Sequence, residues 1–171
     1  MAHRLFHIEL PIQPGWEAIE PFRAAALACV EAIFPKHAVA PGVALVVAEL
    51  LENAVKFGRW EARGEGYFAI RIDGHEDRVE ILVSNPVDPS SEHVGRLAAE
   101  IERIAAAPSP EEAYAKAVRA VALGKRSSLG LLRAAHEGGC DLSLEIAGPV
   151  VHVRGVTRRL GPAPPTPAAP R

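Results

Sequence analysis

Three polar side chains share one face of a mostly apolar segment, residues 43–57, whose pattern predicts a helix, and Glu52 lies at the edge of that face. Glu49, Asn53 and Lys56 stand at positions i, i+4 and i+7, which at about 100° per residue places them within about 60° of arc. Buried carboxylates and amides are costly unless they have partners. An amide oxygen suits Mg²⁺, which prefers hard oxygen ligands, phosphates and water. A carboxylate one turn earlier can accept a proton from an attacking hydroxyl or water.

Two interpretations of this stripe are open on the pattern alone. The first is a solvated face of an amphipathic helix, because charged stripes usually face water. The second is a site at which a carboxylate, an amide oxygen and an ammonium group converge on a metal-bound nucleotide. A second match elsewhere in the chain is needed to choose between them.

The segment from Glu49 to Phe57, ELLENAVKF, resembles the N-box of the GHKL superfamily, which includes gyrase-type ATPases, histidine kinases and anti-sigma-factor kinases. This resemblance implies that the chain binds ATP and Mg²⁺. It assigns the metal to Asn53, the role of general base to Glu49, and a place beside the phosphates to Lys56.

A second segment, residues 127–139 (SSLGLLRAAHEGG), resembles the G2 box of the same superfamily. Small residues at such a helix start let backbone N–H groups approach phosphates. The resemblance implies phosphate contacts for Ser128, Gly130 and Leu131. Lys125 and Arg126, just upstream of the segment, can supply positive charge to the phosphates. By itself the segment is equally well read as a Gly/Ser loop that caps an ordinary helix, and Ser128 stands where the family has its first glycine.

Residues 85–89 depart from the family pattern. The G1 box is Asp-x-Gly-x-Gly, whereas this chain has Asn-Pro-Val-Asp-Pro. The resemblance gives Asn85 the place of the aspartate, and its amide oxygen can still accept a hydrogen bond from the adenine amino group. Pro86 and Pro89 remove N–H donors and restrict the turn. These changes favour a second possibility, a fold kept as a protein-binding module.

The elements that would position these residues follow from apolar periodicity and turn residues. We expect Gly58 to end the 43–57 helix in the left-handed C′ conformation, Asp73-Gly74 to lie in a hairpin turn, and Ser109 to cap a helix. The predicted strands are 5–10, 66–72, 78–84, 141–146 and 150–156, and the predicted helices are 16–34, 43–57, 90–106, 110–122 and 129–136.

This order of hairpins and helices predicts an α+β fold, a two-layer α/β sandwich with a mixed sheet. In the superfamily it is the Bergerat-type, histidine-kinase-like ATPase fold. We expect that domain to span residues 1–160. The Pro/Ala-rich stretch 161–171 is expected to be a disordered tail.

Composition narrows the class of protein. The 171 residues are 49% hydrophobic, which is enough for one buried core, and the formal net charge is −2. Acidic and basic residues are interspersed, so no nucleic-acid or membrane partner is expected. Cys29 and Cys140 stand apart, outside any CxxC motif, and no secretory signal precedes them, which favours reduced thiols and a cytoplasmic location.

Two functions remain open on the sequence. The first is an ATP- and Mg²⁺-binding bacterial regulatory protein, a Ser/Thr protein kinase of the GHKL type that acts on a small partner protein. Residues 84–106 make the SiaB-type regulatory kinases the nearest resemblance. The second is a degenerate GHKL-fold protein that regulates by binding a partner without ATP turnover. A homodimer is compatible with either, using apolar residues of 16–34.

Overall fold

The computed structural model describes residues 3–11, 15–35, 38–60, 68–122 and 129–157. These residues form five strands, five α-helices and one short 3-10 helix. In chain order the elements are β1 (Arg4–Pro11), η1 (Trp16–Ala18), α1 (Ile19–Ile33), α2 (Ala40–Phe57), β2 (Ala69–His75), β3 (Val79–Pro86), α3 (Glu92–Ala105), α4 (Pro110–Ala122), α5 (Leu129–His136), β4 (Cys140–Ala147) and β5 (Val150–Thr157).

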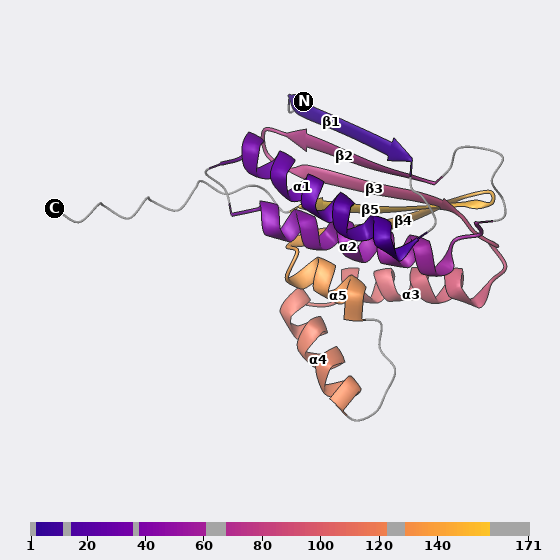
Figure 1. Cartoon of the computed structure of the whole chain (residues 1–171). Coiled ribbons are helices and arrows are strands. Elements are labelled where there is room, and N and C mark those ends of the chain that lie inside the picture. The colour runs from indigo at the N-terminus through magenta and orange to yellow at the C-terminus, as the bar shows by residue number, and fades with distance from the viewer. Residues whose placement is uncertain (1–2, 12–14, 36–37, 61–67, 123–128, 158–171) are drawn as a thin grey trace.

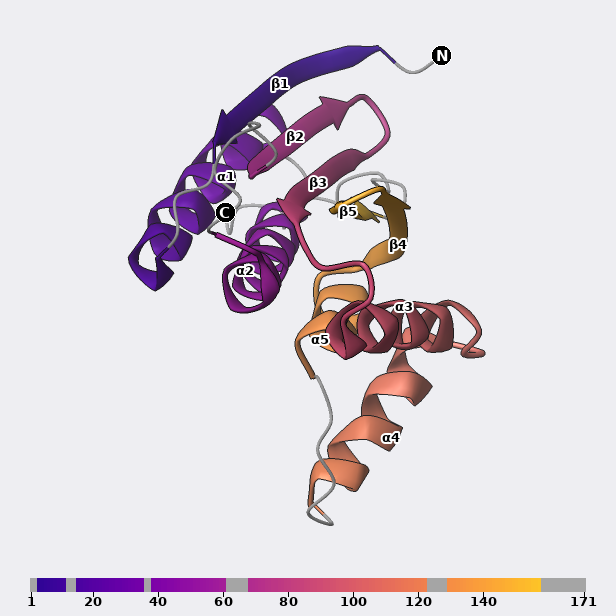
Figure 2. The same cartoon turned by 90° about the vertical axis from the view of Figure 1, so that its right-hand side faces the viewer.

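The strands form one sheet in the order β1-β2-β3-β5-β4, and the helices gather on one of its faces (Figures 1 and 2). The predicted α+β two-layer sandwich is therefore confirmed. All four strand pairings are antiparallel, so the predicted mixed sheet is wrong. The reason is that β5, the second strand of the last hairpin, lies beside β3. Had β4 taken that place, it would have run parallel to β3.

Helix α2 supplies the centre of the core. Pro41 lies in its first turn, where the missing N–H has no helical partner to lose, and the helix begins at Ala40, earlier than predicted. One stripe of side chains repeats at helical spacing and packs toward the sheet. Its fully buried members are Val43, Val46, Val47, Leu50, Leu51 and Ala54.

The turn between β2 and β3 lies later in the chain than predicted. Asp73 and Gly74 belong to β2, and the turn is closed by the His75 N–H donating to the Arg78 carbonyl at 2.8 Å. A Cβ at residue 74 would collide with the ring of Phe6 on the neighbouring strand β1. This glycine therefore makes room for a cross-strand aromatic ring and does not serve the turn.

Gly58 also differs from its prediction. Its backbone is extended, with φ −70° and ψ 146°, and not left-handed. A Cβ there would lie 2.6 Å from the Ala54 carbonyl oxygen and 2.8 Å from the Phe68 ring. Close packing at the end of α2 explains the glycine.

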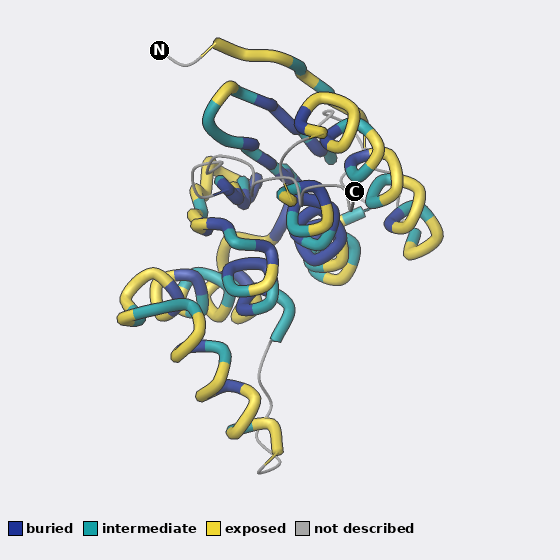
Figure 3. The backbone as a smooth tube through the Cα atoms, turned by 90° about the vertical axis from the view of Figure 1, so that its left-hand side faces the viewer, coloured by how far each residue is buried: buried dark blue, intermediate teal, exposed yellow. Residues whose placement is uncertain are grey.

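Helix α4 extends away from the sandwich and is exposed along most of its length (Figure 3). Its buried residues are Ala113 and Ala117, and the helix packs against α5. Ser109 accepts a hydrogen bond from the Glu112 N–H at 3.2 Å, which confirms the predicted cap. None of the helices described is long and apolar enough to cross a membrane.

Candidate nucleotide site

Helix α2 presents Glu49 and Asn53 one turn apart. The Asn53 side-chain N–H donates to the backbone carbonyl of Glu49 at 2.8 Å. This bond fixes the amide and leaves its oxygen, the atom that a hard cation would bind, without a hydrogen bond among the described residues. The stripe predicted from sequence is thus half-buried, and Glu49 itself is 7% exposed.

Helix α5 closes over the carboxylate of Glu49. Arg133 donates from Nη1 to Glu49 Oε1 at 2.9 Å. The other carboxylate oxygen lies against the Cα of Gly130, where a Cβ would collide with it. Gly138, just beyond α5, similarly leaves no room for a Cβ beside Val46. The glycines of the G2-like segment therefore let α5 pack closely on α2.

Burial is the largest influence on the Glu49 carboxyl, and it raises the pKa of that group. The positive charge of Arg133 lowers the pKa, while the negative charges of Glu52 and Glu137 raise it further. The net result is a pKa above the ordinary glutamate value. A proton acceptor with a raised pKa is typical of carboxylates that act as general bases.

The polar contacts continue from α5 to α4. Arg133 Nε lies 3.6 Å from Glu137 Oε2. A hydrogen bond to Glu137 raises the pKa of Tyr114, together with burial. The Tyr114 ring stacks on His136 with centroids 5.0 Å apart. These contacts connect the Glu49 environment to the exposed helix α4.

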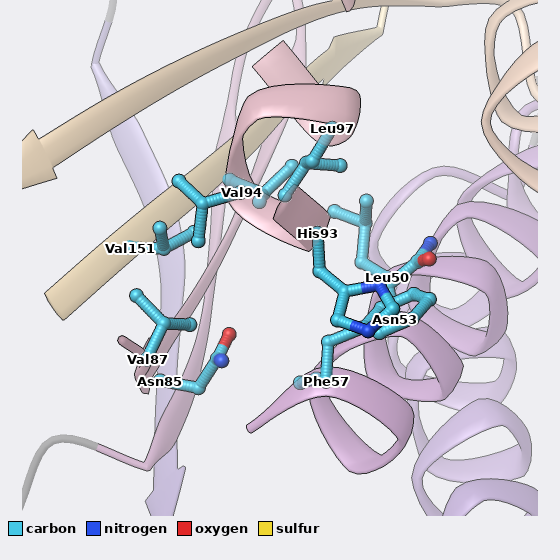
Figure 4. A pocket seen from close by; sticks show the side chains of 11 residues that line it. Leu50, Asn53, Phe57, Asn85, Val87, His93, Val94, Leu97 and Val151 are labelled. Atoms are coloured by element: carbon cyan, nitrogen blue, oxygen red, sulfur yellow. The ribbon is translucent and has the colours of Figure 1, made fainter. Parts of the chain in front are cut away.

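A pocket lies at the other end of the same stripe, beside the last turns of α2 (Figure 4). The space inside it is about 20 Å³, enough for about one water molecule, so a larger ligand would also occupy the open mouth of the pocket. Its wall is mainly apolar. The lining residues are Leu50, Asn53, Ala54, Phe57, Asn85, Val87, His93, Val94, Leu97, Val151 and Val153.

Asn53 and Asn85 are the only asparagines in the chain, and both line this pocket. Asn85 stands near the end of β3, is 4% exposed, and directs its amide into the pocket (Figure 4). The one hydrogen bond that its side chain makes among the described residues is a long donation of 3.4 Å to the Pro86 carbonyl. A buried amide with so little hydrogen bonding is well suited to bind a ligand.

An aromatic pair faces Asn85 across the pocket (Figure 4). The rings of Phe57, at the end of α2, and His93, in the first turn of α3, have centroids 4.9 Å apart and planes inclined by 33°. Arg96 Nη2 lies 3.0 Å from His93 Nδ1. Since arginine only donates, the Nδ1 atom accepts in this contact.

The remaining predicted residues are placed as follows. Lys56 is exposed and lies over the Phe57 ring, with Nζ 5.2 Å from the centroid, but does not line the pocket. The side chain of Leu131 is buried in the core, so only its backbone could meet a phosphate. Lys125 and Ser128 lie outside the described residues, as does the 161–171 segment.

Three residues of this region were not predicted from the sequence. Arg133 belongs to the G2-like segment, and its spacing of three from Gly130 puts both on one helix face, which is a usable signal. Phe57 and His93 had no such signal, because they meet only when α2 and α3 pack together.

The described residues offer a cation one candidate ligand here, the Asn53 amide oxygen, so most of its ligands would have to come from phosphate or water. Among the described residues no three His, Cys, Asp or Glu side chains converge to hold a metal. A metal at Asn53 would therefore need phosphate oxygens and water to complete its coordination. Mg²⁺ bound to a nucleotide meets that requirement.

The fold and the pocket define a two-layer α+β protein with a candidate ligand site between the central helix and the sheet. No protein family and no curated protein sequence gives a significant match. Among solved structures the chain is similar to one chain of the crystal structure of the SiaB-SiaC complex from Pseudomonas aeruginosa, with a TM-score of 0.61. The two are 20% identical, and the match covers 90% of each chain. At that identity the likeness establishes a shared fold.

Proposed function

We propose that this protein is an ATP- and Mg²⁺-binding regulatory protein of the GHKL type that phosphorylates a hydroxyl group on a small partner protein. The observation that supports this proposal is the convergence of three segments that are far apart in sequence. The N-box-like helix contributes Glu49 and Asn53, the 85–89 segment contributes Asn85, and the G2-like helix contributes Gly130.

Under this proposal a nucleotide would lie along α2. Its base would enter the apolar pocket toward Asn85, and its phosphates would run along α2 toward Gly130 at the start of α5. Asn53, between these two points, would hold Mg²⁺ through its amide oxygen. The bound ion would offset negative charge on the phosphates during transfer.

Glu49 would then act on the partner. The partner hydroxyl would attack the γ-phosphorus, the bond to the β–γ bridging oxygen would break, and ADP would leave. Glu49 would take the hydroxyl proton. Its pairing with Arg133 keeps the carboxylate in one place before the partner arrives.

The partner is proposed to be a small regulatory protein. The similar solved structure is a complex of two proteins, which supports a search for a small protein partner here. A homodimer and a cytoplasmic location remain predictions from the sequence.

A second candidate function is partner binding without ATP turnover, and one observation favours it. Pro86 pairs with Val150 at the end of β3, and the Val87 N–H donates to the Pro149 carbonyl at 2.8 Å. The backbone is therefore strand as far as Pro86, and the Val87 N–H continues its hydrogen bonding, whereas the G1 box of the superfamily is a glycine-rich turn. Such a chain could keep the fold and lose phosphate transfer.

The proposal is tested by calorimetric titration with a non-hydrolysable ATP analogue, with and without Mg²⁺. We expect Mg²⁺-dependent binding that Asn53→Ala removes. Glu52→Gln, an exposed position on the same helix, is the matched control and should bind like the wild type. No binding at millimolar nucleotide would favour the second function, and binding unchanged by Asn53→Ala would refute the N-box assignment.

A further inference from the structure

The innermost polar group of the pocket is an amide, at the place where the superfamily resemblance leads one to expect a carboxylate. Asn85 is 4% exposed, and its carbonyl oxygen has no hydrogen bond among the described residues. Its amide points into the pocket (Figure 4). A planar ligand in this pocket would therefore meet a group that can both donate and accept hydrogen bonds.

This difference matters for which purine can bind. A carboxylate only accepts hydrogen bonds, whereas an asparagine amide offers two donors and an acceptor. Adenine presents an amino donor at position 6 beside the N1 acceptor, and a 6-oxopurine presents an acceptor at position 6 beside an N1–H donor. The amide in its present orientation matches the adenine edge. Turning it over about its last side-chain bond breaks only the long 3.4 Å donation to the Pro86 carbonyl and matches the 6-oxopurine edge, whereas a carboxylate would repel the 6-oxo group.

The other walls of the pocket do not distinguish an amino group from an oxygen at purine position 6. Val87, Val94 and Val151 form apolar walls, and Phe57 with His93 forms the aromatic wall opposite. Apolar and aromatic surfaces hold any purine face, so they contribute affinity without distinguishing position 6.

We propose that Asn85 is the specificity residue of this pocket and lets it bind 6-oxopurine nucleotides as well as adenine nucleotides. This inference rests on the proposed nucleotide site. The suitable probe is inosine triphosphate, because guanine adds a 2-amino group that the apolar walls would leave without a partner.

The test is a titration of the full chain with Mg-ATP and with Mg-inosine triphosphate. We expect the two dissociation constants of the wild type to lie within about tenfold of each other. In Asn85→Asp the carboxylate faces the 6-oxo group, so the affinity for inosine triphosphate should fall by about 100-fold relative to that for ATP. His93→Ala is the control, since loss of the aromatic wall should weaken both nucleotides by a similar factor.

The outcomes separate this inference from the proposed function. If ATP binds with Mg²⁺ dependence and inosine triphosphate binds more than about 100-fold more weakly, the inference is overturned and the nucleotide site stands. An unchanged ratio in Asn85→Asp overturns it as well. If neither nucleotide binds, the proposed function fails and the inference fails with it. Should Asn85→Asp not fold by circular dichroism, Asn85→Ala replaces it and must weaken both nucleotides, because an effect on neither would remove Asn85 from the site.

Discussion

Arg133 on α5 donates a hydrogen bond to Glu49 on α2 across 84 residues of sequence, with Nη1 and Oε1 separated by 2.9 Å. The carboxylate side chain is 10% exposed and the guanidinium 42% exposed. The pair therefore joins a buried carboxylate to a guanidinium group that still reaches solvent. It links the two segments that most resemble nucleotide-binding boxes.

Arg133→Met should destabilise the protein by about 1–3 kcal/mol, because it leaves a buried carboxylate without its partner. Urea unfolding at pH 7 measures the effect. Arg119→Met, at an exposed position of α4, is the control and should change the free energy of unfolding by less than about 0.5 kcal/mol. Equal effects of the two substitutions would show that the pair contributes nothing.

Glu49→Gln should stabilise the fold at neutral pH, by roughly 0.5–2 kcal/mol. Burial raises the pKa of Glu49 in the folded state, and Arg133 offsets this only in part. A carboxyl with a raised folded pKa binds its proton more tightly when folded. Its contribution to stability therefore falls as pH rises from the unfolded pKa, about 4.3, through the folded pKa.

Glutamine cannot ionise, so the melting temperature of Glu49→Gln should exceed that of the wild type at pH 7. The difference should shrink toward pH 4. A lower melting temperature for the variant at pH 7 would mean that the Arg133 ion pair outweighs the cost of burial.

Gly130→Ala should destabilise by about 1–3 kcal/mol, since the added methyl group collides with the Glu49 carboxylate. Gly95→Ala is a matched comparison, because residue 95 is also helical but its Cβ would meet no atom within 4 Å. There the gain in helix propensity should stabilise by about 0.5–1 kcal/mol. Thermal unfolding of both variants decides the matter, and a stabilising Gly130→Ala would contradict the close packing of α5 on α2.

Asp73 lies on the face of the sheet that points away from the helices. It should make the free energy of unfolding depend on pH in the acid range. Burial alone would raise its pKa, but His7, Arg71 and Arg4 together outweigh burial and hold the pKa below the ordinary aspartate value. Its His7 contact is 2.7 Å. A depressed carboxyl pKa stabilises the fold above the unfolded pKa, about 3.9, and this stabilisation is lost as pH falls through the folded pKa.

Asp73→Asn should therefore cost about 1–2 kcal/mol at pH 7 and progressively less below about pH 4. Urea unfolding at several pH values measures this. A cost that is the same at pH 3 and pH 7 would mean that the negative charge of Asp73 is not what stabilises the sheet.

Local signals predicted most of the fold. The helices 110–122 and 129–136 have the predicted ends, because apolar periodicity, the Ser109 cap and flanking glycines act within a few residues. The predictions were wrong where contacts between residues far apart in sequence determine the local structure. Gly74 accommodates Phe6 from another strand, and the antiparallel sheet depends on which strand of the last hairpin meets β3.

The candidate site also has residues that the sequence predicted and residues that only the packing of distant helices reveals. The resemblance brought Glu49, Asn53 and Asn85 forward from separate segments, and the structure places the two asparagines in one pocket and Glu49 against Gly130. It gave no role to Arg133 or His93. Their contacts depend on how α3 and α5 pack against α2, which no local pattern encodes.

The measurement that tests the central claim most directly is an NMR titration of protein labelled with ¹⁵N in asparagine only. The chain has two asparagines, 53 and 85, so the spectrum holds two side-chain amide groups, assigned with Asn53→Ala and Asn85→Ala. We predict that an ATP analogue with Mg²⁺ shifts both groups saturably, and that without Mg²⁺ the Asn53 shift is largely lost. If neither group shifts at millimolar nucleotide, the pocket is not a nucleotide site.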